Sequence, residues 1–252
     1  MTDARTLADI NLYAILGTVP LLCELVPEAS ELIRGKNVIL GFSVKDGPVG
    51  SLCFADGKCW FTDSCDSCHI KLSFSSPERF NGMIDGTVTP IPRKGLTKVG
   101  FLLKTFIPLT DILSRNLRAT DEDLADDAFF AASTRLMFHV IAAAIGAIGN
   151  EDKVGQASAS YITDGAIRLM IGGEERCYTL VAKDHRLMLE EGDGTPMTSF
   201  MRFDDLRVAR DLFDGKINAV AAVGEGKVRV GGMISQVDNA NRILDRVAMY
   251  LA

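Results

Sequence analysis

The chain has 252 residues, of which 47% are hydrophobic, so it can build one large or two ordinary packed domains, and disorder is excluded for most of it. Its formal net charge is -6, from 33 acidic and 27 basic residues, without a dense run of Lys and Arg. We therefore expect no nucleic acid partner, and the overall charge does not favour an anionic membrane surface.

The first residues and the cysteines both indicate a cytoplasmic protein. Residues 1–9 include Asp3 and Asp9, and they lack the basic segment and the small-residue cleavage site of a secretory signal. The six cysteines are irregularly spaced, unlike the disulfide framework of a small secreted domain. We expect reduced thiols.

A long apolar helical region at 7–33 is followed by four strand-like stretches at 37–44, 51–54, 58–62 and 69–74. In the first stretch Val38, Leu40, Phe42 and Val44 share one face, and in the fourth His69, Lys71 and Ser73 share the other, which predicts a sheet with one apolar face and one wet face. Because the turns between the stretches are short and of the Asp-Gly type, we expect antiparallel hairpins and no parallel crossover.

The spacing of apolar residues becomes helical after the fourth strand. A helix is predicted over 75–86, then a stretch with Pro90 and Pro92, a fifth strand over 98–103 and a closing helix over 108–117. Proline removes a backbone donor, so the stretch around Pro90 cannot form the same helix or strand as its counterpart in the second half. The polar run at 118–123 marks a domain boundary, which we place between residues 119 and 120.

The second half repeats this order at an offset of 128 to 129 residues, which favours duplication of one unit. A long apolar helix is predicted at 121–149, strands at 165–171, 178–182, 186–190, 198–203 and 227–230, and helices at 204–215 and 239–251. The apolar run at 128–149 could span a bilayer by length, but it contains Arg135, His139 and much Ala and Gly. We read it as a buried or half-buried helix and predict no transmembrane span.

Residues 203–244 resemble the carboxy-terminal half of the sterol carrier protein 2 family. The resemblance rests on Gly215-Lys216 at a helix end, Gly226-Lys227 before a strand and Gly232 after it. With the preceding hairpins it covers about residues 155–252, and more faintly 30–118, where Thr87 replaces the lysine. It implies an α+β protein of two tandem sterol-carrier-like modules, 1–119 and 120–252. Each would be a mainly antiparallel five-stranded sheet covered on one face by helices.

The resemblance implies an apolar tunnel for a lipid, a fatty acyl chain or a sterol-like molecule, and it brings no catalytic residue. We therefore expect a protein that binds and carries such a ligand without catalysis and without a cofactor, and we expect the tunnel to be more certain in the second module. The predicted lining residues of the second module are Met170, Leu180, Met188, Phe200, Phe203, Leu212, Phe213, Met233 and Ile234. Those of the first module are Phe42, Leu52, Phe54, Trp60, Phe74, Phe80, Ile84 and Phe101.

Two other readings stay open at this point. The same apolar residues could fill both cores, and the protein would then be an interaction scaffold. Alternatively, Cys65, Cys68 and His69 match the Cys-x-x-Cys-His pattern of covalent haem attachment and, with Cys59 or Cys53, could bind a metal in a regulatory protein. The sequence also leaves open whether the chain forms a homodimer or serves a partner enzyme.

Overall fold

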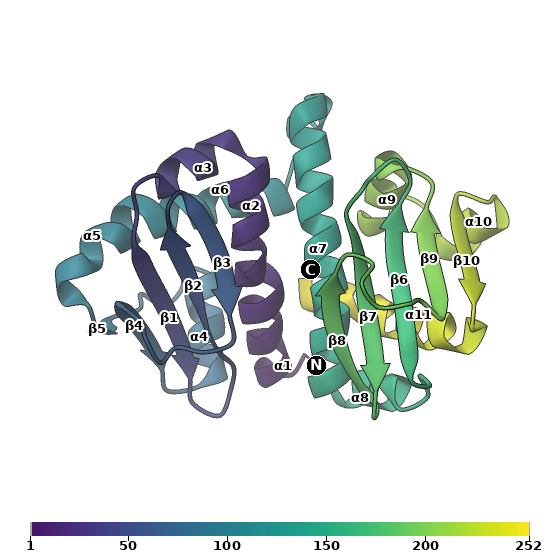
Figure 1. Ribbon diagram of the computed structural model, residues 1–252, viewed down its shortest axis with the longest axis horizontal. Helices are drawn as coiled ribbons and strands as arrows, with labels where there is room; N and C mark the ends of the chain where they lie inside the picture. The colour runs from purple at the N-terminus through teal and green to yellow at the C-terminus, as the bar shows by residue number, and fades with distance from the viewer. Residues whose placement is uncertain (1, 252) are drawn as a thin grey trace. The chain divides into compact units, whose positions relative to one another are not determined.

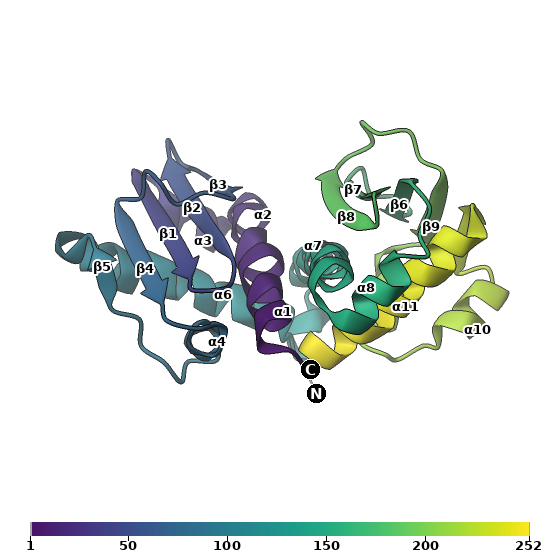
Figure 2. The same ribbon diagram turned by 90° about the horizontal axis from the view of Figure 1, so that it is seen from below.

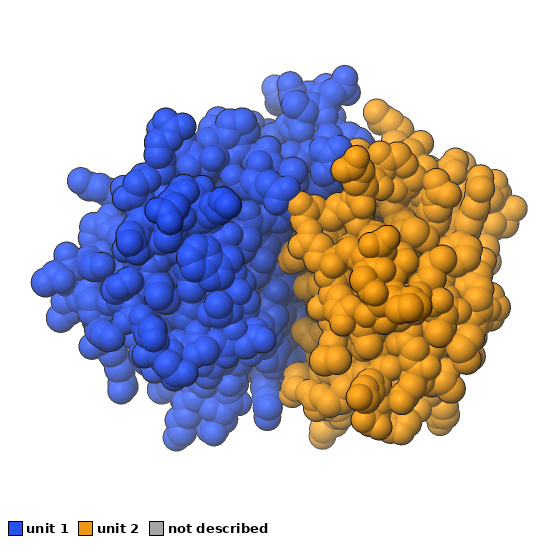
Figure 3. Space-filling view, in the orientation of Figure 1, with its two compact units in different colours: residues 1–136 blue, residues 137–252 orange. Residues whose placement is uncertain are grey.

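The computed structural model describes residues 2–251, which divide into two compact units between Leu136 and Met137 (Figure 3). Each unit contains one five-stranded sheet and its own helices (Figures 1 and 2). Helix α7 (Asp127–Glu151) contributes residues to both units.

In the first unit a helical run precedes the sheet and a second one follows it. The first run is α1 (Ala4–Asp9), the π-helical turn η1 (Ile10–Ile15), the 3-10 turn η2 (Leu16–Thr18), α2 (Val19–Leu25) and α3 (Pro27–Ile33). The strands are β1 (Val38–Val44), β2 (Val49–Ala55), β3 (Lys58–Thr62), β4 (Ile70–Phe74) and β5 (Pro92–Lys94), with α4 (Pro77–Ile84) before β5. The second run is η3 (Leu96–Lys98), α5 (Val99–Phe101), the π-helical turn η4 (Leu102–Phe106), α6 (Ile107–Leu117) and η5 (Asp123–Ala125).

The strands of the first sheet lie in the order β3-β2-β1-β4-β5. Leu40 of β1 lies between Leu52 of β2 and Ile70 of β4, and all three side chains are fully buried against the helices. Three of the four strand pairs are antiparallel, which confirms the mainly antiparallel sheet. The pair of β1 with β4 is parallel, so the sheet is mixed and the expectation of no parallel crossover is wrong. The hairpin β2–β3 and residues 63–69 together form the connection that a parallel pair requires.

Within this connection, residues 63–69 pack on the face of the sheet opposite to the helices. A Cβ atom at Gly41 would lie 2.2 Å from the Sγ atom of Cys68 and 3.0 Å from the Cβ atom of Cys65. The segment containing both cysteines therefore reaches the sheet because residue 41 has no side chain. Ser51, which pairs with Gly41, donates its hydroxyl hydrogen to the carbonyl oxygen of Ser64 and fixes the same segment.

The fifth strand of the first unit lies earlier than the sequence predicts. We expected it over 98–103, but β5 is Pro92–Lys94, and residues 96–106 are helical instead. Pro92 fits an edge strand because it has no backbone hydrogen to donate. Val99, Leu102, Phe106 and Leu109 recur at helical spacing and are buried or partly buried, so helix packing takes these residues away from the sheet.

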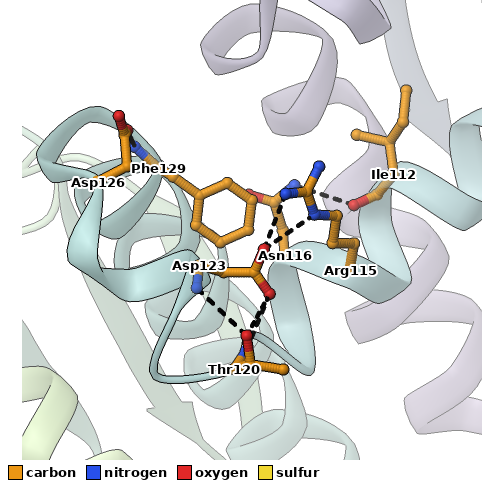
Figure 4. A network of polar contacts seen from close by, with 7 residues as sticks. All are labelled: Ile112, Arg115, Asn116, Thr120, Asp123, Asp126 and Phe129. Atoms are coloured by element: carbon orange, nitrogen blue, oxygen red, sulfur yellow. Dashed lines mark hydrogen bonds and ion pairs between the residues drawn. The ribbon is translucent and has the colours of Figure 1, made fainter.

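A polar network explains why the first unit extends beyond the predicted boundary at 119/120 (Figure 4). Asp123 accepts hydrogen bonds from the guanidinium of Arg115 at 2.8 Å and 3.1 Å and from the hydroxyl of Thr120 at 2.8 Å. The hydrogen bond from Arg115 lowers the pKa of Asp123 to about 2. The same guanidinium lies 5.2 Å from the ring centroid of Phe129 in α7. The run that we read as a linker is therefore fixed to α6 and to the start of α7.

The second unit follows the prediction more closely. After α7 come α8 (Lys153–Ala159), β6 (Gly165–Ile171), β7 (Cys177–Lys183), β8 (Arg186–Glu191), β9 (Ser199–Phe203), α9 (Leu206–Phe213), α10 (Ala219–Gly224), β10 (Val228–Gly232) and α11 (Ile234–Leu251). Helix α10 occupies the place of the stretch around Pro90, where the first unit has no helix. The prediction that proline prevents a common structure there is confirmed.

The second sheet has the same strand order, β8-β7-β6-β9-β10, with β6 and β9 parallel. Arg168 takes the place of Gly41, and its guanidinium donates a hydrogen bond to the carbonyl oxygen of Thr195 in the crossover segment 192–198. Thr179 donates to the carbonyl oxygen of Gly192 at 2.8 Å, as Ser51 does in the first unit. Both crossovers are thus fixed to the corresponding point of their sheet. Descent of the two units from one duplicated unit stays a prediction.

Two helical segments among the described residues are long and apolar enough to cross a membrane by length and composition, Ala4–Leu25 and α7. In the structure 72% of the first apolar window and 44% of the second are buried. Core helices of globular proteins pass the same test. The sequence reading considered the second segment and overlooked the first, and the absence of a transmembrane span stays a prediction.

Candidate functional site

The first unit encloses a cavity of about 520 Å3 between the edge of its sheet and its helices. Strands β4 and β5 contribute Leu72 and Pro92, and α4 contributes Met83 and Ile84. The π-helical turns η1 and η4 and helix α6 supply most of the remaining wall. The lining residues are Ile15, Leu16, Leu72, Met83, Ile84, Gly86, Val88, Thr89, Pro90, Pro92, Val99, Leu102, Leu103, Phe106, Ile107, Thr110, Asp111, Leu113, Ser114, Leu117 and Arg118.

Helix α6 gives this cavity both an apolar and a polar part. Leu113 is buried at the cavity wall, one turn after Leu109 in the core. Thr110, Ser114 and Arg118 follow one another at four-residue spacing, so they lie along one stripe of the helix. Arg118 and Ser114 are exposed. The cavity therefore has apolar walls and hydrogen-bonding groups along one side that reaches solvent.

The predicted lining residues of the first module lie mainly beside the cavity, in a filled aromatic core. Phe42, Phe54, Phe74 and Phe80 are all buried, and none of them is a lining residue. Ring centroids of Phe74 and Phe80 lie 5.1 Å apart in an edge contact. Phe42 lies 5.8 Å from Phe106, which does line the cavity.

Trp60 was predicted to point inward, and this prediction is wrong. Trp60 pairs with Cys53, and both lie on the face opposite to Leu52 and Phe54, so 45% of Trp60 is exposed. Ile84, by contrast, faces inward as predicted and lines the cavity.

The interior of the second unit is nearly filled. The space between its sheet and its helices measures about 10 Å3, which is about enough for one water molecule. Phe138 of α7 stacks on Phe213 at 6.2 Å and contacts Phe203 edge-on at 6.1 Å. The expectation that the second module would have the more certain tunnel is therefore wrong, because aromatic rings occupy that space.

The residues predicted to line the second module fall into two groups. Phe203 and Phe213 line the small apolar interior, Leu180 is fully buried, and Leu212 is half-buried. The other five do not face inward, and the prediction is wrong for them: Met170, Met188, Phe200, Met233 and Ile234.

Strand alternation explains why Met170, Met188 and Phe200 do not face inward. Ile167, Leu169 and Phe203 face the helices, so Met170 and Phe200, which alternate with them, face the other side. Met188 pairs with Val181, one residue away from the inward Leu180, and is 53% exposed. Met233 and Ile234 lie where β10 ends and α11 begins, and both are exposed.

The outer face of the second sheet carries a groove of about 450 Å3. Met170 and Phe200 form part of its floor, together with Arg168 and Arg202 from the same strands. Glu174, Glu175 and Asp193 lie around it. Two guanidinium groups (+2) and three carboxylates (-3) thus line the groove, which leaves it with a formal charge of -1.

The structure separates the residues of the predicted metal cluster. Cys59 lies on the helix-facing side of β3, where a hydrogen bond with Cys23 and burial raise the pKa of its thiol. Cys65 and Cys68 pack on the opposite face at Gly41, where burial and the neighbouring Cys65 raise the pKa of the Cys68 thiol. The Nδ1 atom of His69 accepts a hydrogen bond from the backbone N–H of Ile39 at 2.9 Å. Among residues 2–251 no group of three or more His, Cys, Asp and Glu side chains is placed to hold a metal ion.

His139 is the remaining histidine with a special environment. Its Nδ1 atom lies 3.1 Å from the hydroxyl oxygen of Tyr178, and the two rings make an edge contact. Burial, with a smaller effect from Arg176, lowers the pKa of His139 to about 4. The reading of His139 as a core histidine agrees with this environment.

Sequence reasoning missed most of the cavity wall, which comes from residues 86–118. The error followed from the strand predicted at 98–103. The recurrence of Val99, Leu102, Phe106, Leu109 and Leu113 at helical spacing was the signal that could have found it.

Two five-stranded mixed sheets with the same strand order, each with helices on one face, define an α+β protein of two similarly built units. No protein-family model matches the chain, and no curated protein matches it. Among solved structures it is similar to the UbiJ-SCP2 ubiquinone synthesis protein, with 17% identity over 44% of this chain and 93% of that chain and a TM-score of 0.34.

Two further solved structures are similar to the chain. Sterol carrier protein 2 from Yarrowia lipolytica in its apo form has 18% identity over 40% of this chain and 91% of that chain, with a TM-score of 0.32. A conserved hypothetical protein from Thermus thermophilus, described as a candidate sterol carrier protein, has 18% identity over 44% of this chain and 86% of that chain, with a TM-score of 0.36. At these values the likenesses concern the fold alone.

Proposed function

We propose that the chain binds and carries a lipid or a similarly apolar small molecule without catalysis, and that the cavity of the first unit holds it. The observation that carries this proposal is the cavity of about 520 Å3 with largely apolar walls. This volume falls within the range of roughly 300–1,000 Å3 that small-molecule sites occupy. The second unit, in which the pocket between the sheet and the helices has a volume of about 10 Å3, is proposed to hold no such ligand.

Burial of an alkyl chain supplies enough affinity for such a role. Each buried methylene contributes about 0.8 kcal/mol, so ten of them contribute roughly 8 kcal/mol before the loss of ligand freedom. A dissociation constant of about 1 μM corresponds to about 8 kcal/mol after these losses of at least about 4 kcal/mol, so a chain that buries about 15 methylenes reaches it. Polar groups are then needed only at the end of the ligand, where Thr110 and Ser114 offer hydroxyl groups and Asp111 and Arg118 offer one charge of each sign.

The fit of a fatty acyl or sterol-like ligand follows from this arrangement. The apolar body would contact Ile84, Leu102 and Leu113, and a hydroxyl or carboxylate would lie at the stripe on α6. The six cysteines are free thiols, which supports our proposal of a cytoplasmic location. We propose no cofactor and no catalytic residue.

The test is native mass spectrometry of the purified chain, combined with mass spectrometry of its organic extract. A retained acyl, sterol or isoprenoid species at about one per chain is the expected result, because one unit has a cavity and the other is filled. Lipid-extracted protein should then take up a fluorescent fatty acid. A clean apo mass together with no uptake would refute the proposal, and two ligands per chain would refute its assignment to the first unit alone.

A further inference from the structure

One segment beside the cavity differs in charge from the rest of the chain. Residues 86–110 contain Arg93, Lys94, Lys98 and Lys104 and lie between Asp85 and Asp111, so their net charge is +4, or +2 with the two flanking aspartates, within a chain of net charge -6. The remaining residues together carry -10. The overall charge, on which the sequence reading relied, conceals this local basic segment.

The same segment exposes large aliphatic side chains. Ile91 is 77% exposed, Leu96 66%, Leu103 61% and Ile107 45%. Leu103 and Ile107 are also lining residues of the cavity, so this exposed apolar surface continues into the cavity wall. An aliphatic cluster at a cavity edge with interleaved lysines is typical of a surface that meets lipid.

The segment is an ordered part of the unit and is held at both ends. Lys94 and Pro92 of β5 pair with Lys71 and Leu72 of β4. Gly95 has a φ of +84°, and a Cβ atom there would lie 2.4 Å from the carbonyl oxygen of His69, so the turn lies directly on the edge of β4. At the other end the segment continues into α6. The exposed side chains are therefore presented in a fixed arrangement.

We propose that residues 86–110 dock the cavity edge on an anionic lipid membrane. This inference rests on the proposed function, since docking would let an apolar ligand pass between bilayer and cavity without crossing water. Ile91, Leu96 and Leu103 would enter the interface, and the lysines would meet the anionic headgroups. An acidic protein fits less well, because protein interfaces are depleted in Lys and enriched in Trp, Tyr and Arg, whereas this segment presents Lys with Ile and Leu.

The test is cosedimentation of the full chain with vesicles of phosphatidylcholine, with and without phosphatidylserine. Each basic residue at an anionic surface changes the partition coefficient about fivefold, so the double variant Lys94→Gln/Lys98→Gln should bind the anionic vesicles about 25-fold less. The matched control is Lys45→Gln/Lys58→Gln, which removes one exposed lysine from a turn and one from the start of β3 in the same unit. It should leave binding unchanged.

Two further variants probe the apolar contribution. Ile91→Ser and Leu96→Ser lie outside the cavity lining, and both should lower partition to either kind of vesicle. Raising the salt concentration should weaken binding of the wild-type chain to anionic vesicles, since exposed charges are screened. Equal binding with and without phosphatidylserine, or equal losses in the variant and the control, would overturn the proposal.

Uptake of a fluorescent fatty acid without vesicles separates this inference from the function on which it rests. The Lys94→Gln/Lys98→Gln variant should retain wild-type uptake, because neither side chain lines the cavity. Normal uptake with no vesicle binding would refute membrane docking alone. If an acidic protein captured the chain and vesicles did not, docking on lipid would likewise be refuted.

Discussion

Replacing one leucine by tryptophan in each unit tests whether the two interiors differ as the structure describes. Leu102 and Leu169 are 8% and 5% exposed, and each lines an apolar space, of about 520 Å3 and 10 Å3 respectively. The added ring volume of Leu102→Trp can enter the cavity, so we expect a change below about 1 kcal/mol in the free energy of unfolding. Leu169→Trp must displace packed side chains, at a cost of about 1–3 kcal/mol. Urea titration of lipid-extracted protein, followed by far-UV circular dichroism, measures both.

The same pair of variants gives opposite expectations for ligand affinity. An indole ring that displaces three methylenes of an acyl chain removes about 2.4 kcal/mol, which is roughly 50-fold in the dissociation constant. Isothermal titration of a fatty acid into Leu102→Trp should show this loss. Leu169→Trp should bind as the wild type does, provided it is folded at the temperature of the titration.

Two results would refute this reasoning. If Leu102→Trp destabilises the protein as much as Leu169→Trp does, the first unit has no room for a larger side chain. If Leu169→Trp, while folded, loses affinity and Leu102→Trp does not, the ligand lies in the second unit.

Three further predictions concern stability. The pKa of His139 lies at about 4 in the folded chain against 6.5 in the unfolded chain, so the free energy of unfolding should fall by up to about 3 kcal/mol as the pH drops from 6.5 to 4. Urea midpoints at a series of pH values measure this fall. The variant His139→Gln should lose most of the pH dependence. Gly41→Ala should lower the free energy of unfolding by about 1–3 kcal/mol, because the added Cβ atom meets Cys68. Gly100→Ala has open space around it and should not lower the free energy of unfolding. Differential scanning calorimetry of both variants measures the difference. Asp152→Asn removes the charged partner of the half-buried guanidinium of Arg246, 2.7 Å away, and should cost about 1–3 kcal/mol in urea titrations; a value near zero would contradict a stabilising ion pair.

The strands were predictable because their signals are local. Period-two alternation places Leu40 and Phe42 inward, and turns such as that at Asp56 and Gly57 are brought about by residues that accept a positive φ. The parallel pairing of β1 with β4 was not predictable from connection length between neighbouring strands. The pairing depends on a crossover that contains the whole β2–β3 hairpin. The close approach of Cys68 to Gly41 shows where this crossover passes over the sheet.

The location of the cavity depends on packing that no single stretch encodes. Both units have similar strands and large apolar residues, but Phe138 and Phe213 stack in the interior of the second unit. In the first unit the rings of Phe74 and Phe80 pack to one side and leave the space next to Leu102 open. The sequence therefore predicted the apolar composition of the interiors correctly, whereas the larger cavity lies in the first unit and not in the second, where we expected the tunnel to be more certain.

The cavity has two walls of different mechanical character. Leu72 and Pro92 belong to paired strands, whose register is fixed by the ladder of β4 and β5. Facing them are residues of the π-helical turns η1 and η4, such as Ile15 and Leu102. A π-helical turn holds one residue more than an α-helical turn, and its conversion rotates the following side chains by about 100°. One wall is thus fixed by strand pairing, and the other is formed by turns that hold an extra residue; under the proposed function, a change of helical register there would let one chamber accept ligands of different length while the sheet stays intact.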